Sequence, residues 1–457
     1  MRTSTSFPLA ASLALASGLL LTGCNDSHTY LDTVADDSHD HGHDHGHDHG
    51  HDHDHDHGHH STEGGRLIIT AAPHHDDEHD HDHSHHHVYV FDLHDNDIIA
   101  ELETEHEVSQ LYASPGFRFA LLNQRSDNIT QLLDGGQWQE DHGDHMHDYV
   151  QAPAMLSFQL EGPAPTHYEA HEGLAALFYD GYADPQQNAA VAVFSDHDLA
   201  HGRIGASLTL DINQHGTAEV RGDYLLTTYR AAGTATTLPT QVELYHRHDD
   251  HYDFEIRFTE PCDRLHGSFS IADYTLFGCA DGVLLVEQRG TQFLASKIAN
   301  DEALTGRIGS FSGHKHQHEV VGYAGQAIWI IDAVHGTMRE LDWRGDSEVT
   351  RIASAVDGHG EHYAVLDSSG SLHVFDWDAG FALKDSLALI ESIDHNNRPR
   401  IAVNQQNETI YLTDPVAQEL VMVDLHSLTV ERIALDFEPA LITWLGVAEP
   451  SDDHHDH

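Results

Sequence analysis

The chain has 457 residues, of which 39% are hydrophobic, so it is long enough and apolar enough to form a large packed domain. Its formal net charge is -55 at pH 7, with 76 Asp plus Glu against 21 Lys plus Arg. This balance excludes nucleic acid as a partner, because phosphate binding relies on clustered cations, and it favours divalent cations. The 47 histidines gain protons in mild acid, so metal loading should weaken as the pH falls.

Residues 1–24 have the pattern of a targeting signal. Arg2 precedes an apolar run over residues 7–21, which is too short to span a bilayer stably. The run ends in Leu21-Thr22-Gly23-Cys24, which resembles a bacterial lipobox. We therefore expect lipidation of Cys24 and a membrane-anchored lipoprotein in the periplasm, with an ordinary cleaved signal peptide as the alternative. Asp26 stands one place after the position that favours inner-membrane retention, so both membranes stay open.

Residues 25–64 form an arm of His, Asp and Gly with few apolar residues, which we expect to stay disordered without metal. Imidazole and carboxylate alternate along it, and such His-rich tracts are typical of metal binding. An affinity tag or a solvated acidic run is the alternative reading. The predicted metal ligands of the arm are His41, His43, His45, His47, His49, His51, His53, His55 and His57.

Two further segments share this composition. A short acidic and His-containing tail occupies residues 450–457. A second burst lies inside the body of the chain, where an affinity tag would not recur. Its histidines are His74, His75, His79, His81, His83, His85, His86 and His87.

Residues 65–449 change to short apolar runs of period two, broken by Gly, Asp and Asn, which is the pattern of β-strands. The runs repeat in units of about 40–50 residues, the period of a propeller blade. We predict an all-β propeller domain of eight blades, with seven blades, a β-sandwich pair or a β-helix as alternatives. The unit that begins at Arg66 lacks its innermost strand, and residues 440–445 are predicted to supply it and close the ring.

In a propeller, the loops from the outer strand of one blade to the inner strand of the next lie on one face near the axis. We assign many histidines and two arginines to these loops, and expect some histidines to converge as a closed metal site with Glu319 or Asp180 as oxygen ligands. An ordinary loop position or a core hydrogen bond is the alternative for each. The assigned residues are His106, His145, His147, His167, His171, His266, His316, His318, His359, His362, Arg398 and Arg400.

Three local clusters are more specific than a lone histidine. One comprises His142, His145 and His147; another, at an expected hairpin tip, comprises His246, His248 and His251 beside Asp249 and Asp250; the third comprises His314, His316 and His318 before Glu319. Alternating histidines on an extended chain chelate one zinc ion only if the backbone bends between them. We therefore interpret these clusters as loading sites rather than rigid structural sites.

Cys262 and Cys279 are the cysteines that follow Cys24. An exported protein meets an oxidising compartment, which favours a disulfide between them. Zinc binding by two buried thiolates is the alternative.

Two pairs of stretches resemble the AztD family of periplasmic zinc metallochaperones. Residues 165–173 (PTHYEAHEG) with 178–181 (FYDG) form one pair, and residues 262–267 (CDRLHG) with 277–284 (FGCADGVL) form the other. The resemblance covers roughly residues 65–447. It implies a β-propeller that hands zinc to the solute-binding protein of an ABC importer, with a His-rich N-terminal region that helps bind or move zinc. The histidines that match are His167, His171 and His266.

Together these features predict a non-enzymatic protein that captures Zn²⁺ on its arm, holds it on the propeller and delivers it to the solute-binding protein of a zinc ABC importer. A passive metal-buffering lipoprotein is one alternative. A metal-dependent propeller hydrolase is another, although the sequence lacks a nucleophile elbow and a His-Glu-x-x-His motif. Imidazole sites generally bind Cu²⁺ and Ni²⁺ more tightly than zinc, so we expect both to bind in vitro. The scarcity of Cys and Met argues against Cu(I).

Overall fold

The computed structural model describes residues 62–72, 86–143 and 145–448. The expectations for the lipobox at Cys24, for the arm histidines, for the burst up to His85 and for the tail over residues 450–457 lie outside the described residues. The described part contains 36 β-strands, one short α-helix (α1, Asp196–Ala200) and one 3-10 turn (η1, Arg125–Asp127). None of the helices in this part of the chain is long and apolar enough to cross a lipid bilayer.

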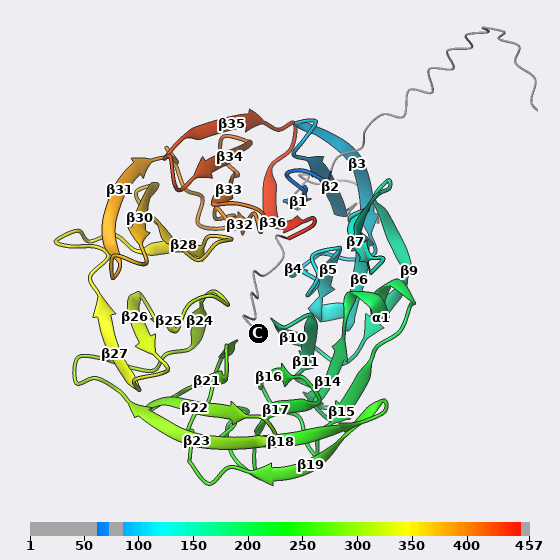
Figure 1. The fold of residues 1–457 in the computed structure, drawn as a ribbon, viewed down its shortest axis with the longest axis vertical. Helices are drawn as coiled ribbons and strands as arrows, with labels where there is room; N and C mark the ends of the chain where they lie inside the picture. Colours follow the sequence, from blue (N-terminus) through cyan, green and yellow to red (C-terminus); the bar gives the residue numbers. More distant parts are fainter. Residues whose placement is uncertain (1–61, 73–85, 144, 449–457) are drawn as a thin grey trace, which may run out of the picture. The chain divides into compact units, whose positions relative to one another are not determined.

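The strands form eight antiparallel four-stranded blades around a central axis (Figure 1). Six blades are separate sheets, and blades 3 and 4 are joined at their outer edges by one parallel pairing, Ser207 with His251, into an eight-stranded sheet. The predicted propeller and the preference for eight blades are therefore confirmed.

In blades 1 to 4 the strands follow one another from the axis outward. Blade 1 has β36 (Pro439–Leu445), β1 (Arg66–Ala71), β2 (His86–Asp92) and β3 (Asp97–Thr104). Blade 2 has β4 (Gln110–Ala113), β5 (Phe119–Gln124), β6 (Ile129–Asp134) and β9 (Ala154–Glu161). Blade 3 has β10 (Pro165–His171), β11 (Leu174–Tyr179), β14 (Ala190–Phe194) and β15 (Ala206–Thr209). Blade 4 has β16 (Ala218–Arg221), β17 (Tyr224–Tyr229), β18 (Gln241–His248) and β19 (His251–Arg257).

The remaining blades follow the same order. Blade 5 has β20 (Ser268–Ile271), β21 (Tyr274–Cys279), β22 (Gly282–Arg289) and β23 (Gln292–Ala299), and blade 6 has β24 (Ser310–Ser312), β25 (Glu319–Ala324), β26 (Ala327–Asp332) and β27 (Thr337–Leu341). Blade 7 has β28 (Arg351–Val356), β29 (His362–Asp367), β30 (Ser371–Asp376) and β31 (Ala382–Ala388), and blade 8 has β32 (Ile401–Val403), β33 (Thr409–Asp414), β34 (Glu419–Asp424) and β35 (Val430–Ala434). Two inserted hairpins complete the set: β7 (Gln137–Asp141) with β8 (Met146–Val150), and β12 (Tyr182–Ala183) with β13 (Gln186–Gln187).

The ring closes as predicted, because the last strand of the chain is the innermost strand of the first blade. β36 pairs antiparallel with β1, with Arg66 opposite Leu445. The indole of the buried Trp444 donates a hydrogen bond of 2.8 Å to the Gly64 carbonyl. Gly65 has a φ of +79°, and a Cβ there would lie 2.5 Å from the Leu445 carbonyl oxygen, so the seam requires glycine. Closure gives the first blade its fourth strand and joins the two ends of the described chain in one sheet.

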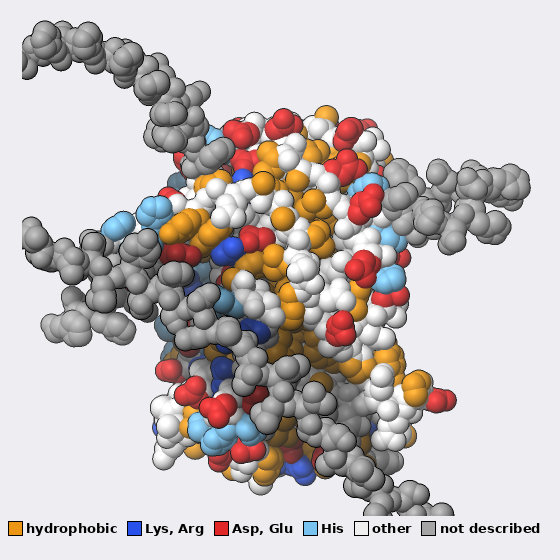
Figure 2. All heavy atoms as spheres, turned by 90° about the vertical axis from the view of Figure 1, so that its right-hand side faces the viewer, with side chains coloured by type: hydrophobic (Ala, Val, Ile, Leu, Met, Phe, Trp, Pro, Cys, Tyr) orange, Lys and Arg blue, Asp and Glu red, His pale blue; other side chains and the backbone are white. Residues whose placement is uncertain are grey.

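The core consists of eight apolar clusters, each shared by two neighbouring blades. The period of two in the sequence explains this arrangement, since successive side chains of a strand point to opposite faces. In β17, Leu225 packs in the cluster between blades 3 and 4, while Leu226 packs in the cluster between blades 4 and 5. Outside the core, acidic side chains are scattered over the face of the molecule seen in Figure 2, where Lys and Arg are fewer.

Antiparallel pairing places successive connections on opposite ends of each blade. The loops between blades, such as 210–217 and 258–267, share one end of the propeller, which we call the inter-blade face. The turns from the first to the second strand and from the third to the fourth share the other end, the hairpin face; they include 357–361 and 425–429. The candidate metal sites of the described residues each belong to one of these two faces.

Candidate metal centre

Three imidazoles meet on the inter-blade face. His167 lies near the start of β10, His215 lies three residues before β16, and His266 lies two residues before β20. Their ring centroids are 4.9, 5.1 and 5.4 Å apart, and one nitrogen of each ring lies within 4.8 Å of the others. Three consecutive blades thus bring one histidine each to a common point.

The hydrogen bonds of these rings fix their tautomers. Each Nδ1 lies next to an oxygen that only accepts, so the neutral form of each ring carries its proton on Nδ1 and a lone pair on Nε2. The pairs are His167 with the Gly216 carbonyl at 2.6 Å, His215 with Asp180 Oδ2 at 2.8 Å and His266 with the Gly309 carbonyl at 2.7 Å. All three rings therefore offer Nε2 as an electron-pair donor.

The Nε2 atoms of His215 and His266 are 3.1 Å apart. When both rings are neutral with the proton on Nδ1, neither has a proton there to donate to the other, so the two lone pairs repel unless a cation binds both. Two nitrogens on one tetrahedral Zn²⁺ at about 2.05 Å are about 3.3 Å apart. The observed separation is close to this value, so the two nitrogens are placed to share one zinc ion.

Burial keeps two of the rings neutral. Burial lowers the pKa of His167 to about 4, although its hydrogen bond with Gly216 acts in the opposite direction. Burial also lowers the pKa of His266, and the nearby Arg307 adds to this effect. Because only a neutral imidazole binds a metal, both rings are ready to act as ligands at pH 7 without first losing a proton.

Asp180, predicted as an oxygen ligand, lies behind His215. Its Oδ2 accepts from His215 Nδ1 and from the Arg125 guanidinium at 3.0 Å. A carboxylate in this position orients an imidazole ligand and increases its basicity. Asp180 Oδ1 is buried and has no hydrogen-bond partner among the described residues, so it is an acceptor that a cation or water would satisfy.

Close backbone packing places His215. Its loop is held by bonds from Gln214 N to the Asp180 carbonyl and from His215 N to the Thr237 carbonyl. A Cβ at Gly216 would collide with Thr228 Oγ1, so glycine is needed for the loop to approach β17. The same glycine presents its carbonyl to His167, which couples the positions of the two imidazoles.

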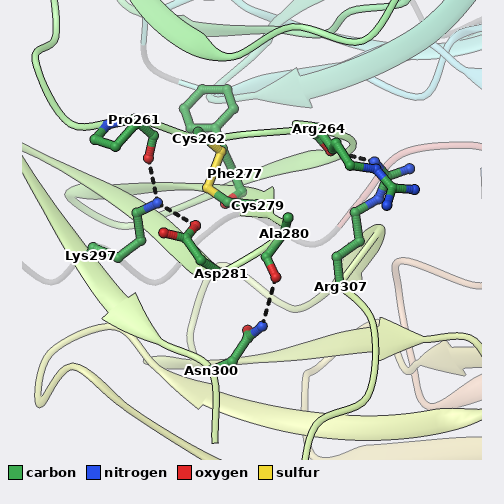
Figure 3. Close-up of a disulfide and its surroundings, with 10 residues drawn as sticks. All are labelled: Pro261, Cys262, Arg264, Phe277, Cys279, Ala280, Asp281, Lys297, Asn300 and Arg307. Atoms are coloured by element: carbon green, nitrogen blue, oxygen red, sulfur yellow. Dashed lines mark hydrogen bonds and ion pairs between the residues drawn. A yellow bond between two sulfur atoms is a disulfide. The ribbon is translucent and has the colours of Figure 1, made fainter. Parts of the chain in front are cut away.

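A disulfide restrains the loop that carries His266. Cys262 and Cys279 are bonded, as predicted, and both are fully buried (Figure 3). Around them, Lys297 binds the Pro261 carbonyl and Asp281, and Arg307 binds the Arg264 carbonyl. His266 N donates to the Gly278 carbonyl at 3.0 Å. The ligand therefore stands on a segment fixed at both of its ends.

Two other predicted ligands lie apart from this centre. The assignment of His171 to an inter-blade loop is wrong, because His171 ends β10 on the hairpin face, where its Nε2 is 2.9 Å from an Arg221 nitrogen. Burial and Arg221 lower the pKa of His171 to about 4, and the guanidinium occupies its lone pair. His106 lies in an inter-blade loop as assigned, but it pairs with Asp127 at 3.6 Å.

The assignment of His145 and His147 to an inter-blade loop is wrong, and His142 of the same local cluster lies beside them. These histidines lie on the exposed hairpin β7–β8, which is inserted between the third and fourth strands of blade 2 on the hairpin face. Their ring centroids are 5.6 to 6.3 Å apart, so the three rings do form the predicted local cluster. Metal binding by this cluster stays a prediction.

Other loop assignments are also corrected. His316 and His318 lie between β24 and β25, and His359 and His362 lie at the turn between β28 and β29, so all four are on the hairpin face. The reason is that the inner strand before each pair, β24 with only three residues and then β28, escapes detection, so the following turn is taken for an inter-blade loop. Glu319, the other predicted oxygen ligand, pairs with Arg339 at 3.3 Å.

The remaining assignments agree with the strand order. Arg398 and Arg400 precede β32 on the inter-blade face, as expected. His248 and His251 lie opposite each other where β18 turns into β19, which confirms the predicted hairpin tip.

His215 was not identified from the sequence. A local signal exists, because His215-Gly216 and His266-Gly267 are both His-Gly pairs placed directly before an inner strand. The pair alone does not single them out, because it also occurs at residues 142–143, 201–202, 335–336 and 359–360. His167 has no such glycine neighbour, and both the loop assignment and the family resemblance predicted it.

Comparisons with known proteins support this fold. No protein-family model matches the chain. Zinc chaperone AztD of Citrobacter koseri is 23% identical over 378 residues, which cover 81% of this chain and 86% of that protein. A crystal structure of C. koseri AztD superposes with a TM-score of 0.69 and 21% identity over 83% of this chain and 97% of the other.

A structure of apo AztD from the same organism gives a TM-score of 0.68 and 20% identity over 84% and 98% of the two chains. The dihydro-heme d1 dehydrogenase NirN is less similar in fold, with a TM-score of 0.53 and 11% identity over 84% of this chain and 75% of that one. These findings confirm the resemblance to the AztD family and the propeller fold.

Proposed function

We propose that this protein is a non-enzymatic zinc chaperone that works outside the cytoplasm. The observation that carries the proposal is that His167, His215 and His266 bring one ring nitrogen each to within 4.8 Å of the others on the inter-blade face, while each Nδ1 faces an oxygen. Three nitrogen ligands suit Zn²⁺ and leave a fourth position open for water or for a ligand from another protein. The similarity to zinc chaperone AztD supports zinc as the cargo.

The surroundings of the centre favour exchange over permanent retention. All three histidines are only partly buried, and the side chain of His215 keeps 29% of its surface exposed. An incoming ligand can therefore reach the ion while the remaining histidines still hold it. Transfer then proceeds by replacing one ligand at a time, which avoids releasing free Zn²⁺.

The finer part of the proposal concerns the partner and the location. We propose that the arm captures Zn²⁺, that the propeller retains it, and that the solute-binding protein of a zinc ABC importer receives it. A lipid on Cys24 would hold the protein in the periplasm at a membrane surface, near such an importer. The composition of the arm and the lipobox pattern support this part.

The test separates a chaperone from a passive buffer. Zinc binding is titrated against a chelator for the full mature chain and for a variant lacking residues 39–60. We expect the shortened variant to retain one tightly bound Zn²⁺. We also expect it to transfer this ion to the purified solute-binding protein faster than it loses the ion to a chelator in a control without that protein. Complete loss of tight binding on deletion would instead identify the arm as a metal sink.

A further inference from the structure

A second group of potential metal ligands lies on the hairpin face, opposite the three-histidine centre. It consists of Glu361, His362 and Glu408, whose ligand atoms lie within 4.8 Å of one another. His362 is the first residue of β29 in blade 7 and Glu361 directly precedes it, and Glu408 directly precedes β33 in blade 8. Equivalent turns of two neighbouring blades therefore bring two carboxylates and one imidazole together.

His362 is oriented in the same way as His215. The ring is buried, and its Nδ1 lies 2.9 Å from Oδ2 of the fully buried Asp357. The same carboxylate also accepts from the backbone N–H groups of Glu361 and His362, at 2.9 and 3.0 Å. Asp357 therefore fixes the turn and the ring together, which is how carboxylates orient histidine ligands of metals.

The ammonium of Lys384 identifies the tautomer of His362. Lys384 Nζ is 2.9 Å from His362 Nε2, and an ammonium can only donate, so Nε2 carries a lone pair and Nδ1 carries the proton. Lys384 also donates to the carbonyls of Leu425 and His426, at 3.0 and 2.9 Å. Lys384 therefore uses all three of its ammonium protons in hydrogen bonds. The lone pair of His362 faces this positive charge.

Glu408 offers the most sheltered oxygen of the group. Its side chain keeps 16% of its surface exposed, and its two oxygens are 3.4 Å from His359 Nδ1 and His426 Nδ1. Two carboxylates neutralise the double charge of a bound dication, whereas the three-histidine centre supplies only neutral nitrogens. One imidazole with two carboxylate oxygens is a donor set that Zn²⁺ accepts.

We propose that Glu361, His362 and Glu408 form a second divalent-cation site, and that the Lys384 ammonium leaves His362 when the ion binds. The exchange replaces one cation by another: Lys384 stays protonated and moves toward solvent on its flexible stem, and the ion takes the lone pair of His362. The site does not require zinc at the three-histidine centre, so either can be tested without the other.

Amine labelling of Lys384 tests the exchange in the full chain. The lysines of the protein are Lys297, Lys315 and Lys384, so each labelled peptide is easily assigned. Labelling by acetic anhydride is followed by mass spectrometry at free Zn²⁺ levels set by a chelator. We expect saturating Zn²⁺ to raise the labelling rate of Lys384 about tenfold, as expected for release of one charged hydrogen bond. Lys297, held by Asp281, is the internal control.

Variants show where the ion binds. Glu361→Gln removes an exposed ligand with little risk to folding, and it should abolish the response of Lys384 to Zn²⁺. Glu255→Gln, at an exposed position of β19, is the matched control and should leave the response intact. An unchanged Lys384 rate in the wild-type protein at saturating Zn²⁺ would overturn the proposal. So would loss of the response in His266→Gln, because the effect would then originate at the three-histidine centre.

Discussion

Each face of the propeller carries a histidine whose Nδ1 is bonded to an aspartate, but the neighbour of the histidine's Nε2 differs between the two faces. On the inter-blade face Asp180 orients His215, and on the hairpin face Asp357 orients His362. His215 Nε2 points at a second imidazole lone pair, whereas His362 Nε2 points at the ammonium of Lys384. A carboxylate that accepts from Nδ1 therefore directs the lone pair of the imidazole to Nε2. The group next to Nε2 then decides how readily a metal ion can bind that lone pair.

This difference predicts different affinities for the two faces. At the three-histidine centre a dication relieves the repulsion between two lone pairs and displaces no charged group. At Glu361, His362 and Glu408 it must first displace the ammonium of Lys384 from His362. We therefore expect the inter-blade face to fill at lower free Zn²⁺ than the hairpin face.

The largest expected effect comes from removing a ligand of the first centre. His266→Gln should lower its Zn²⁺ affinity by more than the roughly 10- to 100-fold typical of losing an orienting partner. Competition with a chelator, in a background lacking residues 39–60, measures this change. His106→Gln is the matched control, since His106 is on the same face but pairs with Asp127. Equal affinities of the two variants would contradict the assignment of His266.

The disulfide distinguishes the two faces, because only the His266 loop depends on it. Replacing Cys262 and Cys279 by Ser should lower the free energy of unfolding by about 3 kcal/mol, the value typical of a short closed loop. Thermal or urea unfolding measures this change. The affinity of the first centre should fall as well, while the zinc response of Lys384 should persist. A variant that keeps full affinity would show that hydrogen bonds alone hold the loop.

Asp180→Asn tests how much one orienting carboxylate contributes to the Zn²⁺ affinity of the three-histidine centre. An amide nitrogen or oxygen can face His215 Nδ1, so the ring is no longer held in one tautomer. We expect the Zn²⁺ affinity of the first centre to fall about 10- to 100-fold. Asp127→Asn, which removes the partner of His106, serves as the control in the same chelator competition. An unchanged Zn²⁺ affinity would mean that Asp180 contributes only its ion pair with Arg125.

The fold was largely predictable because its main signals are local. Alternating runs such as Leu225-Leu226 encode two apolar faces, and Trp444 marks the strand that closes the ring. It was less predictable which run forms which strand of its blade, since β24 has three residues and the β7–β8 hairpin interrupts blade 2. Histidines near these elements were consequently assigned to the wrong face.

The candidate site was predictable only in part, for a different reason. His167 and His266 belong to stretches that resemble a known family, and Asp180 lies in one of them. His215 and the orienting role of Asp180 depend on which loops meet across three blades. The position of Lys384 in front of His362 likewise depends on its bonds to the turn of blade 8 that carries His426. No local pattern in the sequence records such distances.

The smallest expected effect concerns pH and the metal-free protein. Burial lowers the pKa of His171 and of His314 to about 4, whereas an unfolded chain protonates histidine near 6.5. The unfolded state therefore binds more protons between these values, so stability is full above pH 6.5 and declines toward pH 4. In excess chelator, the melting temperature of the wild-type protein should fall between pH 6.5 and pH 4 by a few degrees more than the melting temperature of His171→Gln. Identical pH profiles for the two proteins would show that His171 is not held neutral by burial beside Arg221.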